Sequence, residues 1–498
     1  MWKLIFLLVL FSHVRATGQN RLARIDSLVS KRIADYELSG NILLAEKGNV
    51  LYERSIGLAN TRTGRPNNQN SSFQLASVSK LFTSVAILQL KDKHRLKLDD
   101  PVRKYIPELT NKAITIRHLL THTSGLVDYQ ILEKPYFQDT SKVFEINDIP
   151  AAINNAPDAY RFAPGERWSY SNSGYNLLAL VVERVSKLRF QDYLRQHIFI
   201  PANMLHSYIS TPLIKVSEPD KTVGYDYLNF APWILQRADS LPQNHIELLH
   251  LNGLIGMGNV FSTTSDLLNF DRALYRGTLL NQASLDEAFK PTRLTNGELA
   301  SNGWKNTSAY QGLGWCVLKD TTLGKVVFHS GGEPGAVTMF IRNVTKNQTV
   351  IVLNNVTHRS THTTAMSLLH LLNGGSAQTD KLSIANAFSR TLIKSGIDEA
   401  WTTFHEIKTD TARFYLDERE MNRAGLGMFY NGFKNQGIEL LRLNTVLFPA
   451  SSNVYDSYAT ALTALGKRQE AIKMYRKILE MNPKAVRAQK ALADLGAK

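Results

Sequence analysis

Hydrophobic and polar positions along the chain follow two spacings, one typical of helices and one typical of strands. Apolar residues recur every three or four positions over residues 21–36, which predicts an amphipathic helix packed on a larger body. Two apolar runs, residues 41–46 and 50–57, flank a turn at Gly48 and Asn49 and predict a β-hairpin. Residues 81–90 are apolar on nearly all sides, so the helix predicted there should lie inside the protein.

Later segments continue this mixture of helices and strands. A short helix is predicted over residues 115–120, and a loop that starts at Pro164 leads into a helix over residues 177–185. Three apolar runs predict strands of an antiparallel meander, at residues 326–328, 338–342 and 349–353. The pattern therefore predicts an α/β (α+β) fold in which an antiparallel sheet is flanked by helices.

Beyond about Gly375 the chain consists of amphipathic helices with an internal period. Residues of the same kind recur after 34 positions, as in Gly432 and Gly466 or Pro449 and Pro483. This is the length of a tetratricopeptide repeat, and residues 452–484 resemble one closely. Residues 383–415 are a candidate degenerate first repeat. Such helices either offer a groove to a protein partner or pack against the rest of the chain, and the sequence leaves both open.

The first 18 residues have the order of a secretory signal. Lys3 precedes an apolar run over residues 4–11, and small residues follow at Ala16 and Gly18, where we expect cleavage. The run is too short to span a bilayer, and no other stretch looks transmembrane. We therefore expect a periplasmic or secreted protein that is not an integral membrane protein after signal removal; the alternative is that the segment stays uncleaved as a membrane anchor.

Composition narrows the class of protein. The chain has 498 residues, of which 43% are hydrophobic and 20% charged, so it can form several globular domains. Its formal charge of +15 is not accompanied by a nucleic-acid motif or a long basic run, so we expect no nucleic-acid partner and attribute the charge to anionic surfaces or acidic substrates. The single cysteine, Cys316, excludes an intrachain disulfide and is expected to be buried and inert.

Metal binding is not predicted. His118 and His122 have the four-residue spacing that can place two ligands on one helical face. A third ligand is missing from the pattern, and Gly125 suggests that a structural turn follows. We expect neither a metal nor another cofactor.

One pair of residues suggests nucleophilic catalysis. Ser77 and Lys80 lie three positions apart at a helix start, so one helical turn brings the hydroxyl and the amine together. A buried lysine with a lowered pKa can take the proton of a serine and make it a nucleophile. On its own the pair is equally consistent with a capping serine and an exposed lysine.

Two further patterns add groups that an acyl transfer needs. Tyr170 and Asn172 offer a phenol for proton transfer and an amide for a substrate carbonyl; Tyr227 and Asn229 have the same spacing, but in a segment without clear periodicity. The run His329-Ser330-Gly331-Gly332 ends a predicted strand, where glycines let a substrate approach and backbone amides can face an oxyanion.

The three motifs, taken in this order, resemble the serine β-lactamase and penicillin-binding protein superfamily, most closely its class C, D,D-peptidase and esterase branch. The resemblance covers residues 20–375 and implies a sheet flanked by helices with an additional all-helical subdomain. It also implies an exported hydrolase that cleaves an amide, ester or lactam, such as a cell-wall peptide, through an acyl-enzyme.

The resemblance implies a role for each motif residue. Ser77 would be the acylated nucleophile, Lys80 its activating partner and Tyr170 a general base or proton relay. Asn172 would orient the acyl side chain, His329 and Ser330 would line the far wall, and the N–H groups of Ser77 and Gly332 would form the oxyanion hole. Many β-lactamases carry a lysine in place of His329, which is charged only in part near neutral pH, so hydrolysis of β-lactams is not implied.

The predicted domains are a signal peptide (1–18), a β-lactamase-like hydrolase domain (20–375), a helical linker or degenerate repeat (376–417) and tetratricopeptide-like repeats (418–498). The alternative function is a periplasmic cell-wall-peptide binding or scaffold protein that uses its repeats and has little catalysis. Retention of Ser77, Lys80 and Tyr170 favours the enzyme, since a binding module needs none of them.

Overall fold

The structure is a computed structural model that describes residues 20–497, apart from residues 112, 129, 215, 303–307, 359 and 379–380. The predicted signal peptide lies outside the described residues. The chain forms two compact units: the first comprises Met1–Asp226 and Gln236–Gln378, and the second comprises Tyr227–Leu235 and Thr379–Lys498. The division falls close to the predicted boundary at residue 375, but the second unit also takes a segment from within the predicted hydrolase domain.

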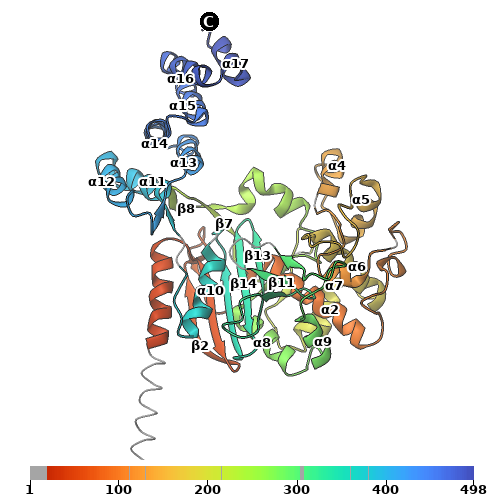
Figure 1. Cartoon of the computed structure of the whole chain (residues 1–498). Coiled ribbons are helices and arrows are strands. Elements are labelled where there is room, and N and C mark those ends of the chain that lie inside the picture. Colours follow the sequence, from red (N-terminus) through yellow and green to blue (C-terminus); the bar gives the residue numbers. More distant parts are fainter. Residues whose placement is uncertain are drawn as a thin grey trace, which may run out of the picture. The chain divides into compact units, whose positions relative to one another are not determined.

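An eight-stranded antiparallel sheet forms the centre of the first unit (Figure 1). Strand β15, the last strand of the meander, pairs with β1, the first strand of the chain. In spatial order the strands are β10 (Ser301–Asn302), β11 (Ala309–Gln311), β12 (Cys316–Leu318), β13 (Val326–Glu333), β14 (Ala336–Asn343), β15 (Gln348–Asn354), β1 (Gly40–Glu46) and β2 (Asn49–Ile56). The predicted hairpin and meander are confirmed, with β13 extending five residues beyond the predicted end at Phe328.

Alternating side chains of the sheet build two separate hydrophobic cores. On one face, residues such as Leu43 and Phe340 pack with the buried helices α2 (Lys80–Asp92) and α6 (Asn172–Ser186). On the other face, Ile42 and Met339 pack with α10 (Ser360–Leu372) and with Ile25 of the first helix, which spans residues 20–34. A period of two along each strand produces this division, because successive side chains point to opposite faces. Because helices cover both faces of the sheet, its central strands are apolar at successive positions instead of alternating between apolar and polar residues.

Helices and short strands surround this sheet. The remaining helices of the first unit are α2 (Lys80–Asp92), α3 (Ile116–Leu120), α4 (Gln130–Gln138), α5 (Ile149–Asn155), α6 (Asn172–Ser186), α7 (Phe190–Leu194), α8 (Thr264–Tyr275), α9 (Gln282–Ala288) and α10 (Ser360–Leu372). Its short strands are β3 (Leu58–Asn60), β4 (Arg65–Pro66), β5 (Phe73–Gln74), β6 (Tyr208–Ile209) and β9 (Val260–Ser262), and the hairpin of β7 (Tyr225–Leu228) and β8 (Ala231–Arg237) leads into the second unit.

Two helix starts differ from the sequence prediction. Ser77 lies in the 3-10 turn η1 (Ala76–Ser79), and α2 begins only at Lys80. The helix expected from residue 177 begins five residues earlier, at Asn172, because the Ser171 hydroxyl caps it by accepting the N–H of Gly174. The cap places Asn172 on a rigid helix rather than on the preceding loop.

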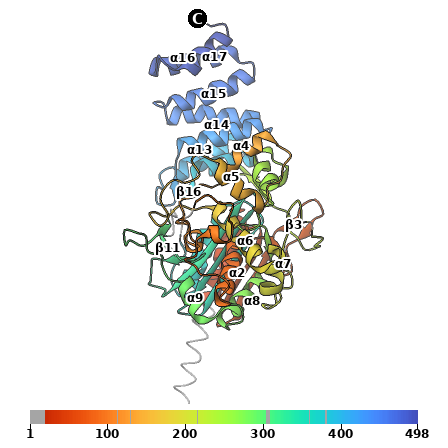
Figure 2. The ribbon, with the colours of Figure 1, turned by 90° about the vertical axis from the view of Figure 1, so that its right-hand side faces the viewer.

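Paired helices make up most of the second unit, and Figure 2 shows α13 to α17 following one another as a stack. The helices are α11 (Ile384–Ser395), α12 (Ile397–Ile407), α13 (Glu418–Tyr430), α14 (Lys434–Leu447), α15 (Ser452–Ala464), α16 (Arg468–Met481) and α17 (Val486–Asp494), and two short strands, β16 (Leu382–Ser383) and β17 (Phe414–Tyr415), pair beside them. The predicted helical tail is confirmed. None of the helices in the described part of the chain combines the length and the apolar composition needed to cross a membrane.

Candidate active site

The Ser77 hydroxyl and the Lys80 amine meet in the turn that precedes α2. Their Oγ and Nζ atoms are 3.0 Å apart, because residues three positions apart in a 3-10 turn lie almost directly above one another. Lys80 is fully buried, and its Nζ also donates to Asn172 Oδ1 at 2.6 Å and to the carbonyl of Met257 at 2.9 Å. The reading of Lys80 as an exposed surface residue is thereby excluded.

Tyr170 is the second side chain that contacts the Ser77 hydroxyl. Its phenol donates to Ser77 Oγ at 2.9 Å, and its ring packs on the His122 imidazole with a centroid separation of 4.3 Å. His122 Nδ1 accepts the backbone N–H of Ser171, which ties the imidazole to the loop that carries Tyr170. Packing and hydrogen bonding together hold the phenol at the nucleophile.

Asp128 fixes the orientation of Asn172. The carboxylate accepts both the backbone N–H and the side-chain N–H of Asn172, each at 2.9 Å. The amide oxygen of Asn172 is therefore turned toward Lys80. Sequence reasoning missed Asp128, since it lies six residues after His122 in no recognisable motif and only the fold brings it to α6.

Burial controls the protonation of the site. Desolvation lowers the pKa of Lys80 to about 7, although the negative charges of Asp128 and Glu333 oppose the shift. Desolvation raises the pKa of the Tyr170 phenol, which keeps it protonated. Burial and the nearby Lys80 lower the pKa of His329 to about 3. The expectation of a partly charged His329 near neutral pH is therefore wrong: its imidazole is neutral.

The edge of β13 packs directly on the nucleophile turn. The Thr338 hydroxyl, on the neighbouring strand, donates to the Leu75 carbonyl at 2.7 Å. Between them lies Gly331, where a Cβ atom would overlap both Leu75 O and the Thr338 hydroxyl, so only glycine allows this contact. Ala76 has a positive φ of 46°, which is unusual for a residue with a side chain, and it directly precedes Ser77.

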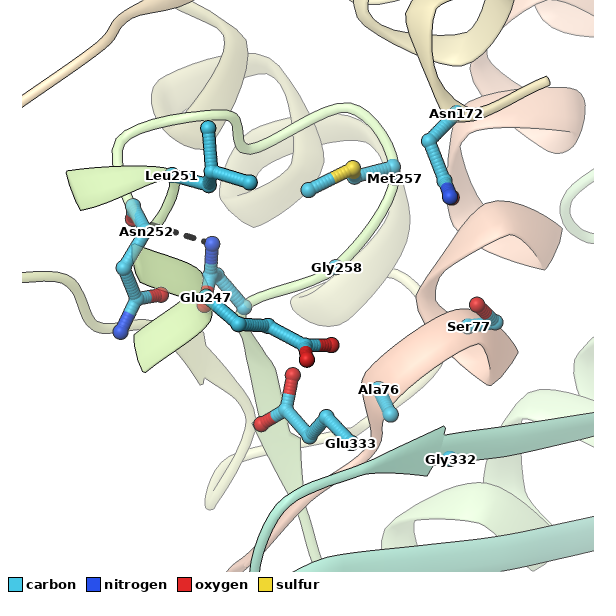
Figure 3. A pocket seen from close by; sticks show the side chains of 11 residues that line it. Ala76, Ser77, Asn172, Glu247, Leu251, Asn252, Met257, Gly258, Gly332 and Glu333 are labelled. Carbon is cyan, nitrogen blue, oxygen red and sulfur yellow. Dashed lines mark hydrogen bonds between the residues drawn. The ribbon is translucent and has the colours of Figure 1, made fainter. Parts of the chain in front are cut away.

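A small pocket of about 30 Å³ opens beside Ser77 (Figure 3). Its walls include Asn172, Met257, Gly332 and two acidic residues, Glu247 and Glu333. The last two were not singled out from the sequence; the position of Glu333 directly after the two glycines is the one local signal that it could reach the site.

The third motif contributes to the pocket mainly through Gly332. His329 is buried beside it, with Nδ1 2.7 Å from the carbonyl oxygen of Ser330, and is not among the residues that line the pocket. Ser330 is paired with Met339, whose side chain belongs to the core on the far face of the sheet. Its buried hydroxyl has no partner among the described residues.

The other candidate residues lie elsewhere or serve the structure. In the part of the chain that the structure describes, no three His, Cys, Asp or Glu side chains are arranged to hold a metal ion. His118 Nδ1 accepts the N–H of Thr115 in a capping box of α3. Cys316 is buried, and burial raises the pKa of its thiol to about 12, in keeping with an inert residue. The alternative Tyr-x-Asn pattern at Tyr227 belongs to the second unit.

Comparisons with known proteins agree with this geometry. A model of the Beta-lactamase family matches residues 25–373, and a model of the Tetratricopeptide repeat family matches residues 452–495. Penicillin-binding protein 4* of Bacillus subtilis is 36% identical over 341 residues, which cover 68% of this chain and 72% of that protein. The putative penicillin-binding protein PbpX of the same organism is 30% identical over 270 residues, or 53% of this chain and 61% of that protein.

Solved structures share the fold. A penicillin-binding protein from Bacillus halodurans is 26% identical and superimposes with a TM-score of 0.58 over 70% of this chain and 99% of its own. The D-amino acid amidase from Ochrobactrum anthropi SV3, at 21% identity, has a TM-score of 0.56 over 71% of this chain and 96% of its own. As its three motifs predicted, the chain belongs to the serine β-lactamase and penicillin-binding protein family of hydrolases, and it carries a tetratricopeptide repeat near its C-terminus.

Proposed function

We propose that the protein hydrolyses an amide or ester through a covalent acyl-enzyme on Ser77. One observation carries the proposal: Ser77 Oγ has a buried amine at 3.0 Å and a phenol at 2.9 Å, so two proton-transfer groups serve one hydroxyl. Such an arrangement activates a serine that would otherwise be a weak nucleophile.

In the acylation step, uncharged Lys80 Nζ accepts the proton of Ser77 as Oγ attacks the carbonyl carbon. The N–H groups of Ser77 and Gly332 hold the developing oxyanion. Tyr170 gives its proton to the departing nitrogen or oxygen as that bond breaks. The Lys80 ammonium then passes the proton taken from Ser77 to the phenolate, so both groups return to their starting forms. Water then attacks the acyl-enzyme, with its proton taken by the same pair, and the acid leaves with Ser77 regenerated.

The neutral state of His329 supports an amide or ester rather than an anionic β-lactam as the better substrate. A lysine at this place would offer a positive charge to a carboxylate, whereas the imidazole with a pKa of about 3 offers none at neutral pH. The D-amino acid amidase with the same fold is consistent with an amide donor.

Export and a partner for the repeats complete the proposal. The signal-like residues 1–18 support a periplasmic or secreted location, where cell-wall peptides are accessible. The tetratricopeptide repeat at residues 452–495 supports an interaction with another protein.

Intact-protein mass spectrometry tests the nucleophile. The mature protein is mixed with a penicillin, a D-Ala-D-Ala peptide and a p-nitrophenyl ester, and with a serine-directed phosphonate as a covalent label. We expect an adduct or turnover that is lost in Ser77→Ala and retained in Ser301→Ala, which changes an exposed serine of strand β10. Labelling that persists in Ser77→Ala would reject Ser77 as the nucleophile, and the best of the three donors identifies the substrate class.

A further inference from the structure

Two carboxylates face each other in the pocket beside the nucleophile. Glu333 ends strand β13, and Glu247 lies on the helical turn η7 (Ile246–His250). Figure 3 shows their carboxyl groups pointing toward one another, and both residues line the pocket that contains Ser77. A substrate held at Ser77 must therefore place some group near these carboxylates.

No cation of the protein occupies the space between them. Among the residues that the structure describes, neither Glu247 nor Glu333 forms an ion pair within 4.0 Å. Lys80 interacts with Glu333 over a longer distance, but its Nζ already donates to Ser77, Asn172 and the Met257 carbonyl. The positive charge that would balance the pair is thus not supplied from inside the site.

A third acceptor lies beside the pair. Gln74 also borders the hollow to which Glu333 belongs, and its side-chain N–H donates to Asn259 Oδ1 at 3.0 Å. The Oε1 atom of the same amide is buried and accepts no hydrogen bond within the described part of the chain. Gln74 also forms a side-chain hydrogen bond with Glu333. Buried polar atoms are normally satisfied, so its free Oε1 can accept a further donor that enters the hollow.

A cation between the two carboxyl groups would relieve the repulsion between them. Burial and the facing Glu247 raise the pKa of Glu333 to about 8, and burial raises the pKa of Glu247. Two carboxylates in one pocket disfavour each other's charge until a cation or a shared proton lies between them. A protonated amine supplies both the charge and several N–H donors.

The size of the pocket limits which cationic group can lie between the two carboxylates. A volume of about 30 Å³ holds roughly two water-sized groups, which suits a primary ammonium. Glu333 and Asn252 also line a neighbouring hollow of about 430 Å³, which leaves room for the rest of a substrate.

We propose that Glu247 and Glu333 bind a primary ammonium group of the acyl donor and so select amine-bearing amides or peptides for Ser77. The inference rests on the proposed acyl-enzyme function. The ammonium has two possible sources, the free α-amine of an N-terminal D-residue or the side-chain amine of a diamino acid. Both present the same charge and donors to the pair.

Two matched pairs of substrates test the selection and separate the sources. D-alanine p-nitroanilide is compared with its N-acetyl derivative, and Nα-acetyl-D-lysine p-nitroanilide with Nα-acetyl-D-norleucine p-nitroanilide. We expect kcat/KM to favour the amine-bearing member of one pair at least tenfold, and the preference to fall to less than threefold in Glu333→Gln and Glu247→Gln. Glu298→Gln, on an exposed loop of the same unit, is the matched control and should keep the preference.

Each outcome decides between the two proposals. Ser77-dependent turnover of p-nitrophenyl acetate without an amine preference in either pair would overturn the ammonium site and leave the proposed function intact. A preference that survives in both glutamine variants would overturn the role of the two glutamates. Absence of all Ser77-dependent turnover would overturn the proposed function, and the ammonium site with it. A preference in the alanine pair identifies an α-amine, and one in the lysine pair identifies a side-chain amine.

Discussion

At the scale of single residues, the charge on Lys80 determines when the site can act. Its pKa lies at about 7 because burial disfavours the ammonium form. Only uncharged Lys80 can take the Ser77 proton, so kcat/KM for p-nitrophenyl acetate should rise as the pH increases through about 7 and then level off. A pH profile of the full-length protein measures this inflection.

A substitution that keeps residue 80 positively charged is the control for the pH profile. Lys80→Arg stays protonated throughout this range and should lower kcat by about 10²- to 10⁴-fold, the usual contribution of a general base. An inflection close to 10, the ordinary range of lysine, would contradict a base whose pKa is lowered by burial.

Asp128 acts on the nucleophile through Asn172 and is a positioning residue. In Asp128→Asn, the new amide can no longer accept both N–H groups of Asn172, so the Asn172 amide is expected to flip and to turn its NH₂ toward Lys80. Loss of the nearby negative charge also lowers the pKa of Lys80 further. We expect kcat to fall by about 10²-fold and the pH inflection to move below that of the unsubstituted protein.

The shift in the pH profile separates this role from a general loss of structure. Asp158→Asn, an exposed substitution in the same unit, should change neither kcat nor the inflection. A lower kcat with an unshifted inflection would show that Asp128 does not act on the charge of Lys80.

At the scale of elements, the packing of β13 on the nucleophile turn depends on one glycine. In Gly331→Ala the Cβ atom overlaps the Leu75 carbonyl and the Thr338 hydroxyl, so the turn η1 must move away from the strand. Overpacking of this kind costs about 1–3 kcal/mol and should lower both the unfolding temperature and kcat.

Gly332 is the matched control for this packing. A Cβ atom there meets nothing within 4 Å, so Gly332→Ala should leave the unfolding temperature nearly unchanged even if it alters substrate binding. The unfolding temperatures of the two variants test this packing. Equal losses of stability would contradict a specific contact at Gly331.

Local patterns in the sequence were sufficient to predict several central elements and the candidate reacting groups. Ser77 and Lys80 are close because a single turn brings them together, and β13 to β15 follow from their apolar runs. Asp128 and Glu247 could not be found in this way, because only the tertiary fold carries them to the site. The charge of His329 was also beyond the sequence, since its pKa depends on how deeply the strand is buried.

At the scale of the whole molecule, the chain enters the second unit twice. Residues 227–235 belong to it although they interrupt the first unit in sequence. Phe230 is buried against the Phe433 ring at 6.1 Å, and the Asn229 carbonyl accepts from Arg390 at 3.1 Å. The hydrophobic core of α11 to α14 is thus completed by a segment that a cut near residue 375 or 418 would leave behind.

Removal of residues 379–498 should therefore reduce solubility more than activity. The shortened chain exposes the partly buried Trp233 and the buried Phe230, whose burial is worth about 1.5–3 kcal/mol, and we expect it to aggregate. Adding Phe230→Ser and Trp233→Ser should restore a soluble protein whose Ser77-dependent ester turnover is within about threefold of the full chain. The reason is that Lys80 and Tyr170, which hydrogen-bond Ser77 Oγ, both belong to the first unit. Size-exclusion chromatography and ester turnover of the two shortened chains test this, and equal solubility with and without the serine substitutions would show that the segment is not part of the second core.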